Sequence, residues 1–294
     1  MARAIAFFGD LHGFHDRMVR AVREWQERAK QRIGLIVCAG DFHAVRNEED
    51  RKAMVSALYR KRRGDFVDYF RGRKRFPAEV LFIGGNHEPY NLLETLPRGG
   101  LVGPNCRYLG RYGVLERFGL RFAGLTGIFS PKAYPRGRLP VDYADAAVLG
   151  NAQFKKQSTY FVKEEVEALS RMGPPDVLVL HEWPRQLPEL ARPGSLEGRA
   201  GMSINEPGRQ LLEALKPRWL FCAHMHRYFR GDIDWPDGRM TTFVCLSQVI
   251  SQRGGFMAVL RPDEAGEWVV ESGPTFGAPE MKQEMKGTEG TQAT

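Results

Sequence analysis

Short apolar runs alternate with longer amphipathic stretches over the first third of the chain. Three of these runs are rich in β-branched or aromatic residues and end beside glycine or alanine, which predicts buried strands at residues 4–8, 34–38 and 80–83. Apolar positions recur at helical spacing in residues 16–32, and the charge-rich stretch 48–70 is also expected to be a helix. This alternation is typical of a largely parallel sheet covered by helices.

The pattern changes in the middle of the chain. Residues 106–126 form short strand-like pieces separated by glycine, which predicts a local antiparallel meander. Residues 130–151 contain three prolines and two glycines and are expected to form a long irregular loop, a kind of loop that often carries function.

The remaining sequence predicts more helices and strands of one domain. Helices are expected at 158–172 and 207–215, and strands at 177–180, 219–222, 241–246, 255–260 and 267–270. We find no internal repeat and no linker that divides the chain. Residues 1–272 are therefore expected to form a single catalytic domain, and the polar residues 273–294 a disordered tail.

Composition narrows the class of protein. Hydrophobic residues make up 43% and charged residues 27%, as in soluble globular proteins, and the formal net charge of +8 favours anionic partners such as nucleic acid. A solvated basic surface would give the same charge. Three of the four cysteines lie in apolar runs and none forms a CxxC pair, which favours a reducing cytoplasm. No apolar run has the length of a membrane span or a signal peptide, so a cytoplasmic location without a membrane partner is expected.

Residues suited to metal binding follow five of the predicted strands, in the segments GDLHG (9–13), AGDFHA (39–44), GGNHE (84–88), LHEW (180–183) and AHMH (223–226). Strand ends of an α/β sheet converge on one edge, where ligands bind. Carboxylate and imidazole together favour Mn, Fe or Zn over Mg, and two such ions about 3.5–4 Å apart can clamp a phosphoryl group. The candidate ligands are Asp10, His12, Asp41, Asn86, His181, His224 and His226.

Each segment alone has an ordinary structural explanation. Asp10 and Asp41 could cap helices, and His181 alone could be a core histidine. The prediction depends on the set, because six of the seven histidines lie in these segments, each just after a predicted strand. The seventh, His15, is expected on the first helix without a catalytic role.

The order D-x-H, GD, GNH, H and H-x-H resembles that of the calcineurin-like metallophosphoesterase superfamily. Within this superfamily the chain further resembles the RNA lariat debranching enzymes, and the resemblance runs over residues 5–230. The segments that carry it include CAGDFHAVRNEED, VLFIGGNHEPYNLLETLPRGG, GLTGIFSPKAYPRG and LKPRWLFCAHMH. It implies an α/β fold of the metallophosphoesterase type, a β-sandwich of two mixed sheets flanked by helices, with metals at the strand C-terminal ends. It also implies hydrolysis of the 2′-5′ phosphodiester of branched RNA.

The resemblance also implies individual roles. One metal ion would be held by Asp10, His12 and His226, and the other by Asn86, His181 and His224, with Asp41 bridging them. His87 would be the general acid that protonates the leaving oxygen, although a further ligand or a turn residue is the alternative.

Two positions of this chain differ from the residues that the debranching enzymes usually have. Eukaryotic debranching enzymes commonly have cysteine where this chain has Asp10, and a carboxylate there better suits a complete two-metal site. The family typically has glutamine where this chain has His43. Whether His43 contacts a metal, a phosphate or only solvent stays open.

Loop 130–151 corresponds to the segment that grips the branch in the family, where Tyr134, Arg136 and Arg138 would stack on a base and pair with phosphates. A solvated loop fits the sequence equally well.

Other functions remain open at this point. The same frame would serve a phosphoesterase for a small nucleotide or a phosphoprotein, or a non-catalytic scaffold. The basic charge and the arginines of loop 130–151 favour nucleic acid, and the complete ligand set disfavours a scaffold. The sequence does not predict the oligomeric state or which metal is native.

Overall fold

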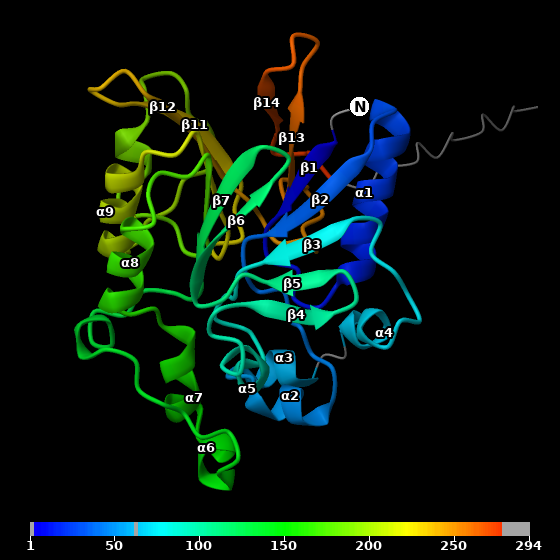
Figure 1. Ribbon diagram of the computed structural model, residues 1–294, viewed down its shortest axis with the longest axis vertical. Helices are drawn as coiled ribbons and strands as arrows, with labels where there is room; N and C mark the ends of the chain where they lie inside the picture. Colours follow the sequence, from blue (N-terminus) through cyan, green and yellow to red (C-terminus); the bar gives the residue numbers. More distant parts are fainter. Residues whose placement is uncertain (1–2, 62–63, 278–294) are drawn as a thin grey trace, which may run out of the picture.

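Two β-sheets packed face to face form the centre of the computed structural model, which describes residues 3–61 and 64–277 (Figure 1). Within these residues the first sheet has seven strands, in the spatial order β14 (Trp268–Glu271), β13 (Met257–Pro262), β1 (Ala4–Phe8), β2 (Ile33–Cys38), β3 (Glu79–Phe82), β5 (Cys106–Tyr108) and β4 (Gly100–Gly103). The second also has seven, in the order β6 (Tyr112–Arg117), β7 (Leu120–Leu125), β8 (Val177–Leu180), β10 (Trp219–Cys222), β12 (Met240–Cys245), β11 (Phe229–Asp234) and β9 (Glu197–Gly198).

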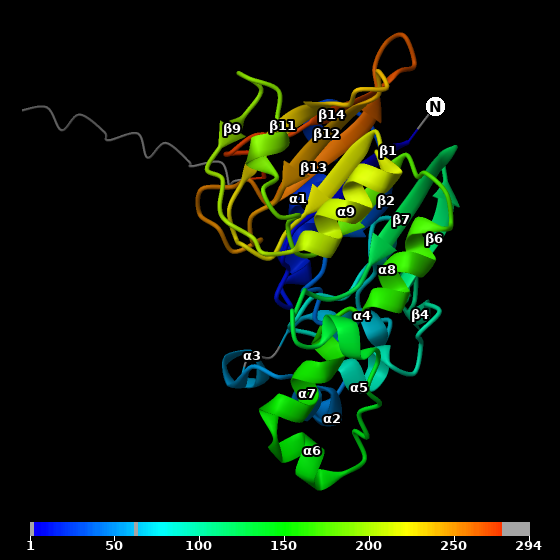
Figure 2. The same cartoon turned by 90° about the vertical axis from the view of Figure 1, so that its left-hand side faces the viewer.

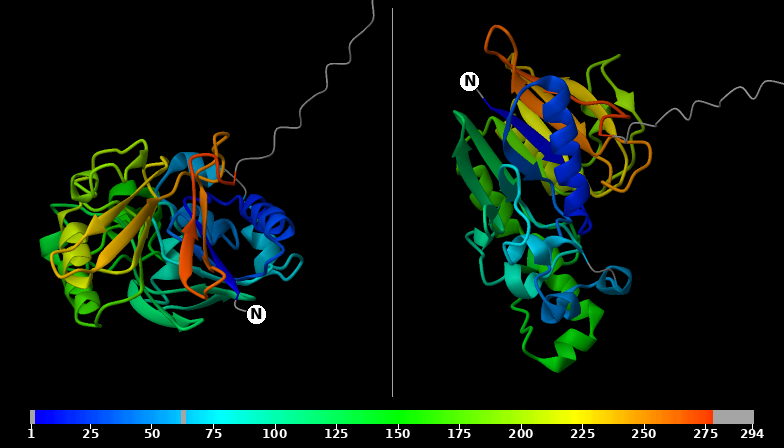
Figure 3. Two further views of the ribbon diagram at one scale, coloured as in Figure 1. Left: turned by 90° about the horizontal axis from the view of Figure 1, so that it is seen from above. Right: turned by 90° about the vertical axis from the view of Figure 1, so that its right-hand side faces the viewer.

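Helices cover the outer face of each sheet. Helix α1 (His15–Ala29) lies on the first sheet, and α8 (Lys163–Ser170) and α9 (Glu206–Leu215) lie on the second. Figure 2 looks onto α8 and α9, and the right-hand view of Figure 3 looks onto α1. Both sheets mix parallel and antiparallel pairs, so the predicted fold class is confirmed.

Strand β1 shows why the sandwich needs continuous apolar runs. Its residues alternate, with Ala4, Ala6 and Phe8 packing under α1 and Ile5 and Phe7 packing between the sheets. The Phe7 ring stacks on Phe221 of the second sheet, with centroids 3.6 Å apart. Both faces of the strand are covered, and all five of its residues are apolar and buried.

The prediction of one helix over residues 48–70 is wrong. The chain forms α2 (Glu48–Ala53), α3 (Ala57–Lys61) and α4 (Phe66–Phe70), with an extended residue, Met54, ending the first. Gly64 packs so closely on Gly13 that a Cβ atom there would lie 3.1 Å from the Gly13 Cα. The interruptions bring α3 beyond the strand ends, close to α2, which in turn packs on α5 (Tyr90–Leu93) (Figure 1).

Other boundaries differ less. Of the region predicted as an antiparallel meander, β6 and β7 do form an antiparallel hairpin, but β5 joins the first sheet parallel to β3. Loop 130–151 contains a 3₁₀ turn (Tyr134–Arg136) and α6 (Ala146–Gly150), and α7 (Ala152–Thr159) follows it.

The end of the described chain contacts the core. The backbone N–H of Gly255 donates to the carbonyl of Phe276 (2.9 Å). Residues 278–294 of the predicted tail lie outside the described residues. The four cysteines are buried and free. Within residues 3–61 and 64–277, no helix combines the length and apolar character needed to cross a bilayer.

Candidate metal centre

The five polar segments meet in space, as the sequence predicts. Loops after β1 and β2 are joined by the His12 backbone N–H, which donates to the Asp41 carbonyl (2.9 Å). The two sheets are joined at the same place, because the His224 backbone N–H donates to Oδ2 of Asp10 (3.0 Å). Strand ends from both sheets therefore surround one site.

The first group of ligand atoms comes from Asp10, His12, Asp41 and His226, all within 4.8 Å of one another. Nε2 of His12 lies 3.0 Å from Nε2 of His226, which in turn lies 3.8 Å from Oδ2 of Asp10. Three of the four residues are buried, and His226 is partly exposed.

The second group centres on His181. Its Nδ1 lies 2.8 Å from the Ala39 carbonyl, an acceptor, so the ring proton belongs on Nδ1 and the lone pair on Nε2. Nε2 lies 3.1 Å from Oδ1 of Asn86 and 3.5 Å from Oδ1 of Asp41. The ring of His224 lies beside it, with centroids 4.9 Å apart.

These groups fit cations. A lone pair of His181 faces two oxygen acceptors without a proton between them, and Oδ1 of Asp10 is buried with no hydrogen-bond partner among the described residues. Buried acceptors that face one another are unfavourable unless a positive charge lies between them. Mixed imidazole and carboxylate donors suit Mn, Fe or Zn.

The protonation states of these side chains also favour metal binding. Burial lowers the pKa of both His12 and His224 to about 3, so each imidazole is neutral and able to bind a metal near neutral pH. Burial alone would raise the pKa of Asp41, but His181, His87 and His12 lower it well below its ordinary value, so its carboxylate stays ionised. Burial and the charge of Asp41 raise the pKa of Asp10.

The backbone is unusual at this site. Among the described residues, ten other than glycine have positive φ, and five of them are His12, Asp41, His43, His224 and His226. Such residues are uncommon and gather at functional sites. Gly85 is also required, because a Cβ atom there would lie 2.2 Å from Oδ1 of Asp41.

His43 and His87 lie at the edge of the first group. Nε2 of His43 lies 3.5 Å from Nδ1 of His12. The backbone N–H of His87 donates to Oδ1 of Asp41 (2.8 Å), and Nδ1 of its ring is buried without a hydrogen-bond partner among the described residues. Glu88 anchors the neighbouring loop by accepting the backbone N–H groups of Phe42 and His43.

Loop 130–151 is held against the second sheet. Arg138 donates to Oε1 of Glu165 (2.6 Å) and to the carbonyl of Tyr160 (2.9 Å). Tyr134 packs edge-on against Phe129, with centroids 5.6 Å apart. Both side chains therefore fix the loop itself, whereas Arg136 is exposed. The roles predicted for these three residues in substrate binding stay predictions.

Tyr59 also lies at the site, although no sequence pattern indicates it. Its ring stacks on that of His12, with centroids 4.4 Å apart and planes 12° from parallel, and its hydroxyl lies 3.2 Å from Nε2 of His12. The residue lies in the short α3, within a stretch predicted to be a continuous helix. A lone tyrosine in a basic run has no spacing that links it to the metal segments.

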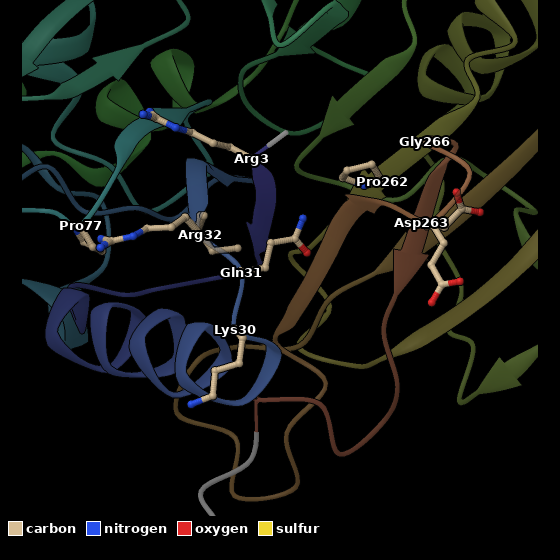
Figure 4. Close-up of a pocket in the computed structure, with 10 residues that line it drawn as sticks. Arg3, Lys30, Gln31, Arg32, Pro77, Pro262, Asp263 and Gly266 are labelled. Atoms are coloured by element: carbon tan, nitrogen blue, oxygen red, sulfur yellow. The ribbon is translucent and has the colours of Figure 1, made fainter. Parts of the chain in front are cut away.

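A separate cavity of about 740 Å³ lies at the other end of the first sheet. Arg3, Lys30, Arg32 and Asp263 line it, and Figure 4 shows these side chains around the amino-terminal ends of β1 and β2. None of the residues of the two ligand groups lines this cavity. The metal centre is at the opposite, carboxyl ends of the same strands.

The molecule is an α/β sandwich with a candidate metal centre at its strand ends. The chain belongs to the calcineurin-like phosphoesterase family, whose model matches residues 3–228. Both resemblances predicted from the motifs are therefore confirmed, and the family supports the predicted enzyme class, a phosphoester hydrolase.

The curated relatives have a more specific name than the family. The chain is 33% identical over 243 residues to the lariat debranching enzyme of Schizosaccharomyces pombe, covering 76% of this chain and 50% of that protein. It is 31% identical over 273 residues to the human lariat debranching enzyme, covering 87% of this chain and 49% of that protein. The chain thus spans about half the length of these relatives. Among solved structures, a dimetal phosphatase from Danio rerio has a TM-score of 0.47 at 12% identity, covering 92% of this chain and 96% of that one, too low to carry an argument.

Proposed function

We propose that this chain is a phosphodiesterase that uses two divalent ions, Mn, Fe or Zn, and acts on RNA. The observation that carries the proposal is the pair of facing acceptor groups that share the Asp41 carboxylate. Oδ2 of Asp41 lies 3.8 Å from Nδ1 of His12, and Oδ1 lies 3.5 Å from Nε2 of His181. One carboxylate with an oxygen toward each group suits a bridging ligand.

The proposal divides the ligands between the two ions. One ion would be held by Asp10, His12 and His226, the other by Asn86, His181 and His224, with Asp41 shared. When bound, two divalent ions supply Lewis acidity to a phosphoryl group and lower the pKa of an attacking water.

His87 is proposed to protonate the leaving oxygen. Its backbone is fixed by the bond to Asp41, and the loop that carries it is anchored by the buried Glu88. Nδ1 is enclosed, so Nε2 is the nitrogen from which a proton would pass to the substrate. Histidine is the side chain that most often transfers a proton in general acid–base catalysis.

RNA as the substrate, and the 2′-5′ bond of a branched strand in particular, is supported by the names of the relatives and by the net charge of +8. Because the chain spans only about half the length of those relatives, their activity is a proposal for this chain. A phosphoesterase of small nucleotides or phosphoproteins is the alternative. The predicted cytoplasmic location also stays a proposal.

The test compares two RNAs of matched composition, one with a 2′-5′ branch and one linear with 3′-5′ bonds only. The metal-free chain is supplied with Mn²⁺, Fe²⁺ or Zn²⁺, and the products are resolved by gel electrophoresis. The proposal predicts release of the branch with the linear strand left intact. Equal rates on both RNAs would remove the branch specificity, and cleavage of mononucleotide esters alone would favour the alternative. His87→Ala serves as the control for the proposed acid.

A further inference from the structure

A groove of about 390 Å³ lies beside the metal centre, between the loop that follows His43 and helix α4. Among the described residues, its charged lining consists of three arginines, Arg46, Arg51 and Arg71, and one glutamate, Glu48. None of the proposed metal ligands lines it. Because the arginines outnumber the acid, the groove suits an anionic ligand.

Two glycines form the boundary between this groove and the metal centre. Gly64 lines the groove, and a Cβ atom on Gly13 would lie 3.1 Å from the Gly64 Cα and 3.7 Å from Nδ1 of His43. Gly13 directly follows His12, a proposed ligand, whose Nδ1 lies 3.5 Å from Nε2 of His43. Since neither glycine has a side chain, the groove and the ligand loop approach each other closely. A chain molecule bound at the metal centre is therefore within reach of the groove.

Arg46 is held rigidly, with part of its guanidinium left free. Its Nε and Nη2 atoms donate to the two oxygens of Asp50 (2.8 and 3.0 Å), a fully buried carboxylate that also accepts from Asn91 (2.8 Å). The guanidinium lies over the exposed ring of Phe70, 5.7 Å from its centroid. An arginine fixed in this way loses little side-chain freedom when its remaining N–H groups meet a phosphate.

Arg71 adds a positive charge that no acid neutralises. It directly follows α4, its side chain is exposed, and it forms no ion pair within residues 3–61 and 64–277. Arg51, in contrast, is paired with Glu48, so that pair adds little net charge. The groove therefore presents one fixed and one unpaired arginine, which together suit a group with several anionic oxygens.

We propose that this groove binds the RNA strand next to the cleaved bond, with Arg46 and Arg71 pairing with one of its phosphates. The inference rests on the proposed function and extends it from the cleaved phosphate to the neighbouring strand. RNA fits better than an acidic protein, because the groove meets a centre proposed to bind a phosphodiester and a nucleic acid offers a further phosphate at each nucleotide. Contacts of this kind position a strand without reading its sequence.

The contact is tested by neutralising each partner in turn. Branched RNAs are made in which a methylene group replaces the bridging 2′ oxygen, so that the strand is not cleaved, and one phosphate at a time becomes an uncharged methylphosphonate. Their affinity for the Mn²⁺-loaded wild type and for Arg71→Ala is measured by fluorescence anisotropy. Arg71→Ala is expected to weaken binding of the unmodified strand by about fivefold. At one phosphate close to the branch, both changes together are expected to cost no more than either alone.

Arg171→Ala is the matched control. It also removes one exposed arginine, at the end of α8 on the other sheet, and is expected to leave every affinity unchanged. The slope of log affinity against log salt is expected to be less steep by about 0.7 in Arg71→Ala alone.

Arg46→Lys keeps a charge but loses the fork to Asp50, and is also expected to weaken binding. Thermal unfolding checks both groove variants. Because Arg71 forms no ion pair within the described ranges, the test stands even if Arg46→Lys does not fold.

The outcomes separate the two proposals. If the wild type hydrolyses phosphodiesters but the losses from Arg71→Ala and from methylphosphonate multiply at every position, the groove is overturned and the proposed function stands. If the wild type hydrolyses nothing but the two changes couple at one phosphate, the proposed function fails and the groove stands. If polyglutamate of matched charge displaces the RNA as well as unlabelled RNA does, the assignment of the groove to RNA is overturned.

Discussion

His15 gives a quantitative prediction about acid stability. It begins α1 and is fully buried, in contact with the rings of Phe42, Phe66, Tyr69 and Phe76. Burial lowers the pKa of its imidazole to about 4, although the Gly13 carbonyl, 3.2 Å from Nδ1, and the charge of Asp16 act in the opposite direction. The native protein therefore holds His15 neutral at pH 5 to 6, where an exposed histidine is largely protonated.

The sign follows from the two pKa values. The unfolded chain binds the proton with the ordinary pKa of 6.5, so below pH 6.5 the unfolded state takes up more protons than the folded state. The stability held by neutral His15 is complete above pH 6.5 and is lost progressively as the pH falls toward 4. At 1.36 kcal/mol per pKa unit, the full loss is about 3 kcal/mol.

His15→Phe tests this directly. Phenylalanine keeps an aromatic ring in the pocket and removes Nε2, which is buried without a hydrogen-bond partner among the described residues. The Gly13 carbonyl keeps a donor, the backbone N–H of Asp65 (2.9 Å). The free energy of unfolding is measured with urea at pH 7, 6, 5 and 4.5. Relative to the wild type, that of the variant is expected to rise by about 1 kcal/mol for each pH unit below 6.5. A stability difference that does not change with pH would refute the reasoning, whatever its size.

Three further predictions concern the site and its support. Gly85→Ala places a methyl group against Asp41 and is expected to weaken metal binding by at least about tenfold in a chelator competition. Gly150→Ala, with open space around it, is expected to leave metal affinity unchanged, and equal affinities of the two variants would contradict the close packing at Gly85. Lys155→Met leaves three carbonyls without their donor and is expected to lower the free energy of unfolding by about 2–4 kcal/mol, against less than about 0.5 kcal/mol for Lys156→Met. Asp41→Asn is expected to reduce bound Mn²⁺, measured by elemental analysis, from two ions per chain to fewer than one; unchanged metal content would exclude Asp41 as the bridge.

The strands were largely predictable because both faces of the central ones are buried. Ala4–Phe8, Val177–Leu180 and Trp219–Cys222 agree with the predicted bounds at both ends, since a strand covered on each side shows an unbroken apolar run. The single helix over 48–70 was not separable from α2, α3 and α4 by periodicity, because its interruption depends on contacts from elsewhere, those of Gly13 and Lys155.

The candidate ligands were predictable for a related reason. Each of them follows a recognisable strand, and the topology of the sheets brings strand ends together. Tyr59 has no such relation to a strand, since it lies in the short helix α3 (Ala57–Lys61). Nor does the sequence indicate that Arg138 pairs with Glu165, because that contact requires the packing of the loop on α8.

Metal stoichiometry followed together with activity tests the central claim most directly. The chain is freed of metal with a chelator and titrated with Mn²⁺, while ion binding and cleavage of the 2′-5′ branched RNA are followed in the same sample. The account predicts no cleavage without metal and activity that reaches its plateau at two ions per chain. Cleavage at full rate in the metal-free chain, or a failure to bind two ions, would contradict it.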